Sequence, residues 1–146
     1  MLKGIPTIIS PELLKALCEM GHGDELVIAD GNFPCHSIGK NAQVIRADGH
    51  GAAEILDAIL TLIPLDAYVD RPAALMEVVP GDTCPTPEIW AAYCDIQQKH
   101  EPDNHKIEMM ERFAFYERAK KAYLIIATGE TAIYANVLLK KGVVKV

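Results

Sequence analysis

The sequence predicts an α/β fold, a single layered domain over residues 1–146 with a largely parallel central sheet flanked by helices. Three observations support this prediction. Short apolar runs alternate along the chain with patterns that begin helices. One of these runs, Leu26–Ala29, is apolar at every position, which is typical of a strand buried on both faces of a sheet. With 146 residues, half of them hydrophobic, the chain has the size of one domain.

The first helix is expected before that strand. Ser10-Pro11-Glu12 is a typical helix start, because serine caps free amides, proline suits the first turn and an acid favours the helix dipole. Gly21 is suited to the left-handed residue that ends such a helix. The helix therefore leads to His22 in a turn, and Asp30 falls at the carboxyl end of the strand that follows.

The later elements are expected in the same alternation. A second helix start, Thr86-Pro87-Glu88, is followed by Trp90 and Tyr93 at a spacing typical of a buried helix face. The polar stretch Gln97–Lys106 is expected to be a linker within the domain. The other expected elements are strands over Gln43–Arg46, Ala73–Val79, Ala122–Ala127 and Asn136–Leu139, a helix over Ala52–Leu62, and a helix in the second half of Arg112–Lys121.

Composition argues against several classes of protein. The net charge is −6 and Lys and Arg do not cluster, so neither nucleic acid nor a membrane surface is an expected partner. The four cysteines contain no Cys-x-x-Cys pair, which favours reduced thiols over a zinc or redox motif. The N-terminus lacks a signal-peptide pattern, and no apolar run approaches ~18 residues, so a cytoplasmic location is expected.

Candidate site residues gather near predicted strand ends. Ligands of open α/β sheets bind beyond the carboxyl ends of strands, where Asp30, Asp48 and the turn after Ala127 are expected. His22 comes before its strand instead. It could therefore meet Asp30 only across a subunit boundary or if the loops fold back.

His22 lies between two glycines, which leave room for a ligand, and an imidazole exchanges a proton readily near neutral pH. The alternative is a helix cap followed by a surface histidine, and for Asp30 the alternative is an Asx turn. No metal site is predicted, because no His-x-His or His-x-x-x-His pair occurs. The possible ligands that lack this spacing are His22, Asp24, Asp30, His36, Asp48 and His50.

Two later segments add polar candidates. Arg112 could grip sugar hydroxyls or a carboxylate with its guanidinium, or it could be solvated beside core aromatic residues. Tyr134 and Asn136 flank Ala135 before the last predicted strand. A phenol and an amide there could serve a polyhydroxylated ligand, although an edge tyrosine with satisfied hydrogen bonds is commoner. The aromatic residues expected in the core are Phe113, Phe115 and Tyr116.

Five of these segments together resemble the fucose mutarotase and ribose pyranase family, in order and over nearly the whole chain. The His-Gly-Asp and Tyr-Ala-Asn motifs resemble both branches, and the Arg-Phe-Ala-Phe-Tyr-Glu-Arg run is similar to the fucose branch. The five runs are Gly21–Glu25, Ala29–Pro34, Val44–Gly49, Arg112–Ala119 and Thr128–Val143.

The resemblance implies a role for each candidate residue. His22 would be the catalytic proton donor, and the sugar would be contacted by Asp30, Arg112, Tyr134, Ala135 and Asn136. Members of the family form ring-shaped assemblies, often decamers, with the site near a subunit boundary. A homo-oligomer of this kind is therefore expected, and it would bring His22 to the sugar.

The activity implied is that of an isomerase, an L-fucose mutarotase, which interconverts the α and β anomers of L-fucose or a related aldose. Ring opening and closing by general acid-base catalysis needs no cofactor, and His22 and Tyr134 would be the two proton-transfer groups. The alternatives are a non-catalytic sugar-binding or transport-accessory protein and a ribose pyranase-type activity.

Overall fold

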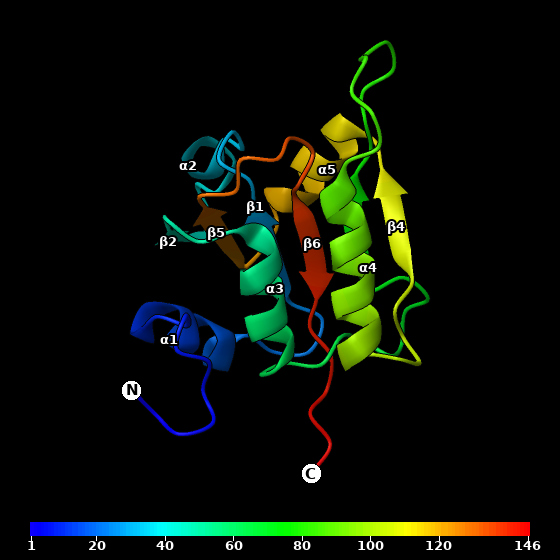
Figure 1. Cartoon of the computed structure of the whole chain (residues 1–146). Helices are drawn as coiled ribbons and strands as arrows, with labels where there is room; N and C mark the ends of the chain where they lie inside the picture. Colours follow the sequence, from blue (N-terminus) through cyan, green and yellow to red (C-terminus); the bar gives the residue numbers. More distant parts are fainter.

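The computed structural model describes residues 1–146 and has a six-stranded sheet at its centre, with helices on both faces (Figure 1). The strand order is β2-β5-β1-β6-β3-β4. β6 runs antiparallel to its neighbours β1 and β3, and the other three pairings are parallel. The strands are β1 (Glu25–Ala29), β2 (Gln43–Ala47), β3 (Ala73–Met76), β4 (Ile107–Met110), β5 (Leu124–Thr128) and β6 (Val137–Lys140). The prediction of an α/β fold with a largely parallel sheet is confirmed.

Five helices cover the two faces of the sheet. Residues of α1, α3 and α4 pack with Leu26 and Ile28 of β1 in one hydrophobic cluster. Residues of α2 and α5 pack with Val27 and Ala29 in a second cluster, because side chains of a strand alternate between its faces. The helices are α1 (Pro11–Glu19), α2 (Cys35–Ile38), α3 (Ala52–Leu60), α4 (Glu88–His100) and α5 (Arg112–Ala119). The predicted burial of this strand on both faces is confirmed.

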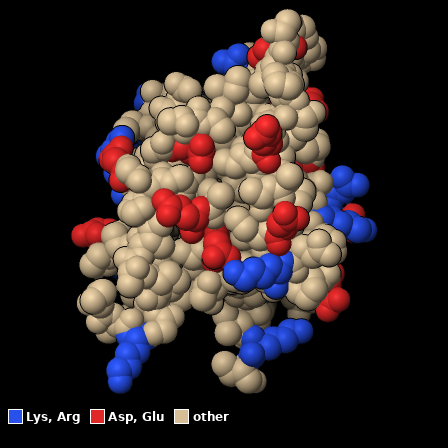
Figure 2. Space-filling view, in the orientation of Figure 1, with Lys and Arg blue, Asp and Glu red and all other residues tan.

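None of these helices combines the length and the apolar character needed to cross a bilayer. Figure 2 shows acidic side chains over the face formed by α3 and α4, with basic side chains beside them over the lower part of α4 and at the margins of the face.

Two short elements were not predicted. β4 is the edge strand beside β3, and it is only partly buried, so it lacks the continuous apolar run of a central strand. α2 is four residues long and begins directly after Pro34. Elements this short show almost no periodicity in their sequence.

Several predicted boundaries were wrong. α4 extends to His100, so the first four residues of the expected linker are helical and Gln97 is buried. α5 begins at Arg112, at the start of its run, because the Glu111 side chain accepts hydrogen bonds from two amides of the first turn. β3 ends at Met76, three residues before the predicted end.

The end of α1 also differs from the prediction. Met20 is extended, and Gly21 does not adopt a left-handed conformation; the residue with positive φ is Gly23, at 85°. Gly21 instead donates its N–H to Asp24 Oδ2 at 2.7 Å. His22 therefore lies inside a small hydrogen-bonded turn.

Two side chains of α4 hold the loop that precedes β6. Trp90 Nε1–H donates to the carbonyl of Tyr134 at 2.7 Å, and the Tyr93 hydroxyl donates to the carbonyl of Ala135 at 2.6 Å. Tyr93 is fully buried, as its spacing predicted. The loop is thereby fixed to the helix layer that covers the sheet.

We expect Tyr93→Phe to lower the free energy of unfolding by roughly 1–3 kcal/mol, because it leaves a buried carbonyl without a donor while the ring still fills its place. The measurement is the midpoint of thermal unfolding. Tyr68→Phe, at a residue that is 74% exposed, should leave the midpoint unchanged. Equal midpoints for Tyr93→Phe and the wild type would contradict the role of this hydrogen bond.

Candidate active site

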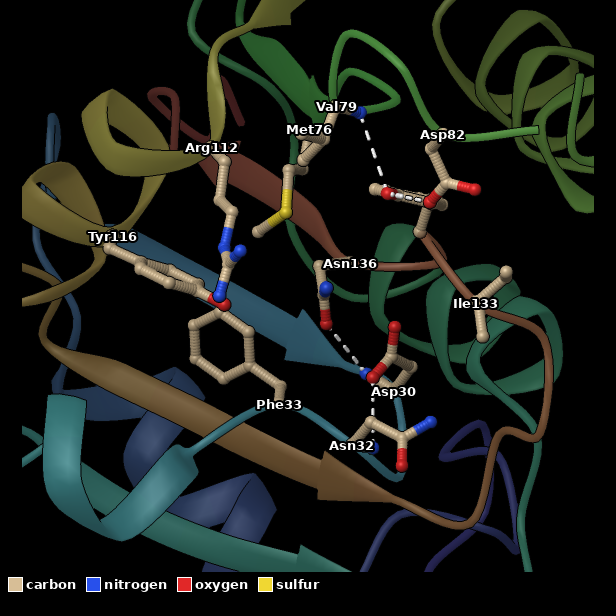
Figure 3. Close-up of a pocket in the computed structure, with 11 residues that line it drawn as sticks. Asp30, Asn32, Phe33, Met76, Val79, Asp82, Arg112, Tyr116, Ile133 and Asn136 are labelled. Carbon is tan, nitrogen blue, oxygen red and sulfur yellow. Dashed lines mark hydrogen bonds between the residues drawn. The ribbon is translucent and has the colours of Figure 1, made fainter. Parts of the chain in front are cut away.

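A cavity of about 260 Å³ opens beyond the ends of the central strands, where β1 and β3 end and β6 begins (Figure 3). Four predicted sugar-contacting residues line it, namely Asp30, Arg112, Tyr134 and Asn136. The fifth, Ala135, is fully buried beside them and does not line the cavity. The structure therefore brings most of the predicted binding residues together from segments far apart in the chain.

Asp30 is the most constrained of these residues and is 4% exposed. Its Oδ1 accepts the N–H of Asn32 at 2.9 Å, so Asp30 does form the Asx turn that was the alternative to a site residue. Its Oδ2 accepts the N–H of Ala135 at 3.3 Å. The N–H of Asp30 donates to Asn136 Oδ1 at 2.8 Å. Because this bond uses the amide oxygen, the NH₂ of Asn136 remains available as a donor to a ligand.

Burial raises the pKa of Asp30 above its ordinary value, and the negative charge of Glu130 acts in the same direction. Hydrogen bonds from the amides of Asn32 and Ala135 oppose this rise only in part. The carboxylate is therefore a strong acceptor whose charge is poorly compensated by the protein around it.

The guanidinium of Arg112 lies over two aromatic rings, 5.4 Å from the centroid of Phe113 and 5.4 Å from that of Tyr116. It forms no ion pair within the chain, and Figure 3 shows it extending into the cavity. A guanidinium held beside aromatic rings can still donate two parallel hydrogen bonds to one ligand. Phe115 is buried as predicted, but Phe113 is 66% exposed, so its assignment to the core was wrong.

Tyr134 is the one residue other than glycine with positive φ, at 56°. Its hydroxyl donates to Asp82 Oδ2 at 2.5 Å and accepts the N–H of Val79 at 3.4 Å. The bond to Asp82 raises the pKa of the Tyr134 phenol and lowers the pKa of the Asp82 carboxyl. A strained backbone that aims a polar side chain into a cavity is typical of functional sites.

Sequence reasoning missed several residues of the cavity. Asn32 and Phe33 lie two and three residues after Asp30, and Met76 is the last residue of β3, so the rule about strand ends could have indicated all three. Asp82 gave no such signal, because it follows Pro80 and Gly81 in what reads as an ordinary turn.

His22 does not lie in this cavity. It is at the opposite end of β1, a strand of five residues that spans roughly 17 Å at ~3.3 Å per residue. Its Nε2 lies 3.0 Å from Asp66 Oδ1, and its ring is tilted against the ring of Tyr68. The loops therefore do not fold back to join His22 to Asp30 within one chain.

Other predicted candidates stay outside the cavity. Asp48 follows β2 as expected, but both its oxygens bind Arg46, at 2.6 and 2.8 Å. His50 pairs with Glu54. No group of three or more His, Cys, Asp or Glu side chains is arranged to hold a metal ion, and all four cysteines are free.

The chain matches the model of the RbsD / FucU transport protein family over residues 3–144. It is 53% identical to the L-fucose mutarotase of Actinobacillus pleuropneumoniae serotype 5b (strain L20), over 100% of this chain and 99% of that protein. Its structure is similar to that of FucU from Bifidobacterium longum, with a TM-score of 0.94 and 64% identity over 98% of this chain and 100% of the other. It is also similar to the structure of the fucose mutarotase of Streptococcus pneumoniae in complex with L-fucose. The TM-score is 0.92, and the identity is 53% over 99% of this chain and 100% of the other. The chain therefore belongs to the RbsD / FucU transport protein family.

Proposed function

We propose that this chain is an L-fucose mutarotase, an isomerase that interconverts the α and β anomers of L-fucose. The observation that supports this most strongly is its 53% identity, over 99% of its length, with a fucose mutarotase whose structure contains L-fucose. This identity favours a mutarotase over a ribose pyranase and over a non-catalytic sugar-binding or transport-accessory protein. Residues 1–146 would form one sugar mutarotase-like domain that acts in the cytoplasm.

The cavity suits one monosaccharide. Its volume of about 260 Å³ is below the ~300–1,000 Å³ typical of pockets for drug-sized ligands. Asp30 would accept hydrogen bonds from sugar hydroxyls, and Asn136 and Arg112 would donate to sugar oxygens. Apolar side chains, Phe33 and Met76 among them, line the same cavity and would face the less polar part of a deoxy sugar.

Mutarotation needs one group that takes the proton of the anomeric hydroxyl and one that gives a proton to the ring oxygen as the bond from C1 to that oxygen breaks. The aldehyde then rotates and the ring closes on its other face. The Tyr134 hydroxyl donates to Asp82 Oδ2, so it would take the proton of the anomeric hydroxyl while passing its own proton to the Asp82 carboxylate, and both protons would return as the ring closes. His22 would be the donor to the ring oxygen. General acid-base catalysis by such groups is worth about 10²–10⁴ in rate.

His22 and the cavity lie at opposite ends of β1, so this proposal requires a site built by two subunits. A homo-oligomer in which one copy places its His22 turn against the cavity of the next would satisfy this requirement. A ring-based decamer is one such assembly. Light scattering of the purified protein would measure its size.

We expect the wild type to accelerate the exchange of the anomeric protons of L-fucose in saturation-transfer NMR, and His22→Gln to lose about 10²-fold or more of that acceleration. His50→Gln is a matched control, because His50 also stands between two glycines but has no role in the proposed reaction. Binding of L-fucose by calorimetry without acceleration by the wild type would favour the sugar-binding alternative.

Co-expression of His22→Gln and Asp30→Asn subunits should restore activity that neither variant has alone. In randomly mixed oligomers, about one quarter of the sites would combine an intact His22 from one subunit with an intact Asp30 from its neighbour. Separate affinity tags on the two variants would isolate the mixed oligomers. Mixed oligomers as inactive as the parent variants would contradict a site shared between subunits.

Because burial raises the pKa of Asp30, its carboxylate takes up a proton at a higher pH than an exposed aspartate does. The neutral acid is the weaker acceptor. We therefore expect the affinity for L-fucose, measured by calorimetry, to fall as the pH is lowered through this raised pKa. Asp30→Asn should bind weakly at every pH without that fall, and an identical pH dependence in both proteins would exclude Asp30 as its source.

A further inference from the structure

The ring of Tyr68 lies directly beside His22 and is left uncovered by the rest of the chain. Its centroid is 5.4 Å from that of the His22 ring, and the two planes are tilted by 51°. Tyr68 is 74% exposed, more than any other Phe, Tyr or Trp of the chain. Tyrosine often dominates the energy of binding surfaces, because it combines a large apolar ring with a polar end.

The end of β6 fixes the position of Tyr68 relative to His22. The N–H groups of Gly23, next to His22, and of Asp66 donate to the carbonyls of two consecutive residues at the end of β6, at 2.9 and 3.0 Å. The N–H of Tyr68 then donates to Asp66 Oδ1 at 3.0 Å, and the same oxygen lies 3.0 Å from His22 Nε2. Any surface that receives His22 therefore receives the Tyr68 ring as well.

The loop that carries Tyr68 is also held from the side of α4. The N–H of Leu65 donates to Glu101 Oε1 at 2.8 Å, and Asn104 Nδ2 donates to the carbonyl of Asp66 at 2.8 Å. The exposed ring thus stands on a backbone that is fixed by hydrogen bonds. A tyrosine side chain has only two rotatable bonds, so it loses little conformational entropy when it packs against a ligand.

The cavity needs cover at its mouth, and the surface around His22 would supply it. Figure 3 shows Phe33 and Arg112 on one side of the cavity and Ile133 on the other, with Asp30 and Asn136 between them. These residues come from one subunit, whereas the proton donor of the proposed reaction comes from the next. The large side chain that arrives together with that donor is the aromatic ring 5.4 Å from it.

L-fucose offers an apolar face to such a ring. It is a 6-deoxy sugar of the galacto configuration, so the C–H bonds at C3, C4 and C5 lie on one face of the pyranose ring, next to the methyl group at C6. An aromatic ring packs well on this kind of face, because the contact removes apolar surface of both partners from water. The carboxylate, amide and guanidinium of the cavity would meanwhile bind the hydroxyls.

We propose that Tyr68 is a sugar-contacting residue of the site in the neighbouring subunit, where its ring covers the mouth of the cavity and packs on the C–H face of L-fucose beside His22. The inference rests on the proposed function, because it assigns a second residue to the surface that brings His22 to the sugar. Tyr68 takes no part in proton transfer. Its contact is the same before and during ring opening, so it contributes to the binding of the sugar and not to the rate of the bound sugar.

The first test measures anomer exchange at increasing concentrations of L-fucose. Tyr68→Ala removes the ring, so we expect KM to rise about 10-fold or more while kcat stays near that of the wild type. Tyr68→Phe keeps the ring and should have the KM of the wild type. An unchanged KM for Tyr68→Ala would refute the proposal, and a fall in kcat alone would mean that the ring only supports His22.

The second test identifies the subunit that supplies the ring. In mixed oligomers of His22→Gln and Asp30→Asn subunits, each restored site combines the cavity of a His22→Gln subunit with the His22 surface of an Asp30→Asn subunit. Tyr68→Ala added to the Asp30→Asn subunit should therefore raise the KM of the restored activity. The same substitution added to the His22→Gln subunit should leave that KM unchanged. The two placements are matched controls, because they carry the same substitutions in different combinations.

Equal effects of the two placements, or no effect of either, would overturn the role of Tyr68, while the restored activity itself would still support the proposed function. If the mixed oligomers recover no activity, the shared site of the proposed function is what fails, and the role of Tyr68 fails with it.

Discussion

The burial of β1 is the constraint on which the rest of the molecule depends. Leu26–Ala29 are each 0% exposed, so both faces of the strand need cover and both of its edges need hydrogen-bonded partners. β5 and β6 supply the edges, and the two helix layers supply the cover. The strand can therefore lie only at the centre of the sheet. Polar side chains can therefore reach solvent or a ligand only beyond the two ends of β1, where His22 and Asp30 lie.

The antiparallel pairing of β6 with β1 connects these two ends. Asn136, just before β6, binds the backbone of Asp30 at the cavity, while Lys140 at the other end of β6 binds the backbone of Asp66 beside His22. These two adjacent strands thus set the geometry at both ends of the strands, at the cavity and at the His22 turn. A shift in their register would disturb the cavity and the His22 turn together.

Sequence patterns could predict what depends on local residues. The apolar run of β1 predicted a strand buried on both faces, and the position of Asp30 after that run predicted that a ligand site lies beyond the carboxyl end of this strand. Neither Asp66 nor Asp82 could be found in this way. Asp66 is 44 residues from His22 and Asp82 is 52 residues from Tyr134, and each partnership depends on packing between elements rather than on any periodic pattern.

Under the proposed function, the distance between His22 and the cavity means that one chain alone would hold an incomplete site. At its mouth Ile133 is 50% exposed, and Phe113, beside Arg112, is 66% exposed. A neighbouring copy that brought its His22 turn to this mouth would cover such apolar side chains at the same time. It would thereby exclude water from the sugar, and exclusion of water strengthens every charged interaction within a site. In the proposed assembly, oligomer formation and proton transfer would depend on the same contact, because the surface that covers the sugar would also deliver its proton donor.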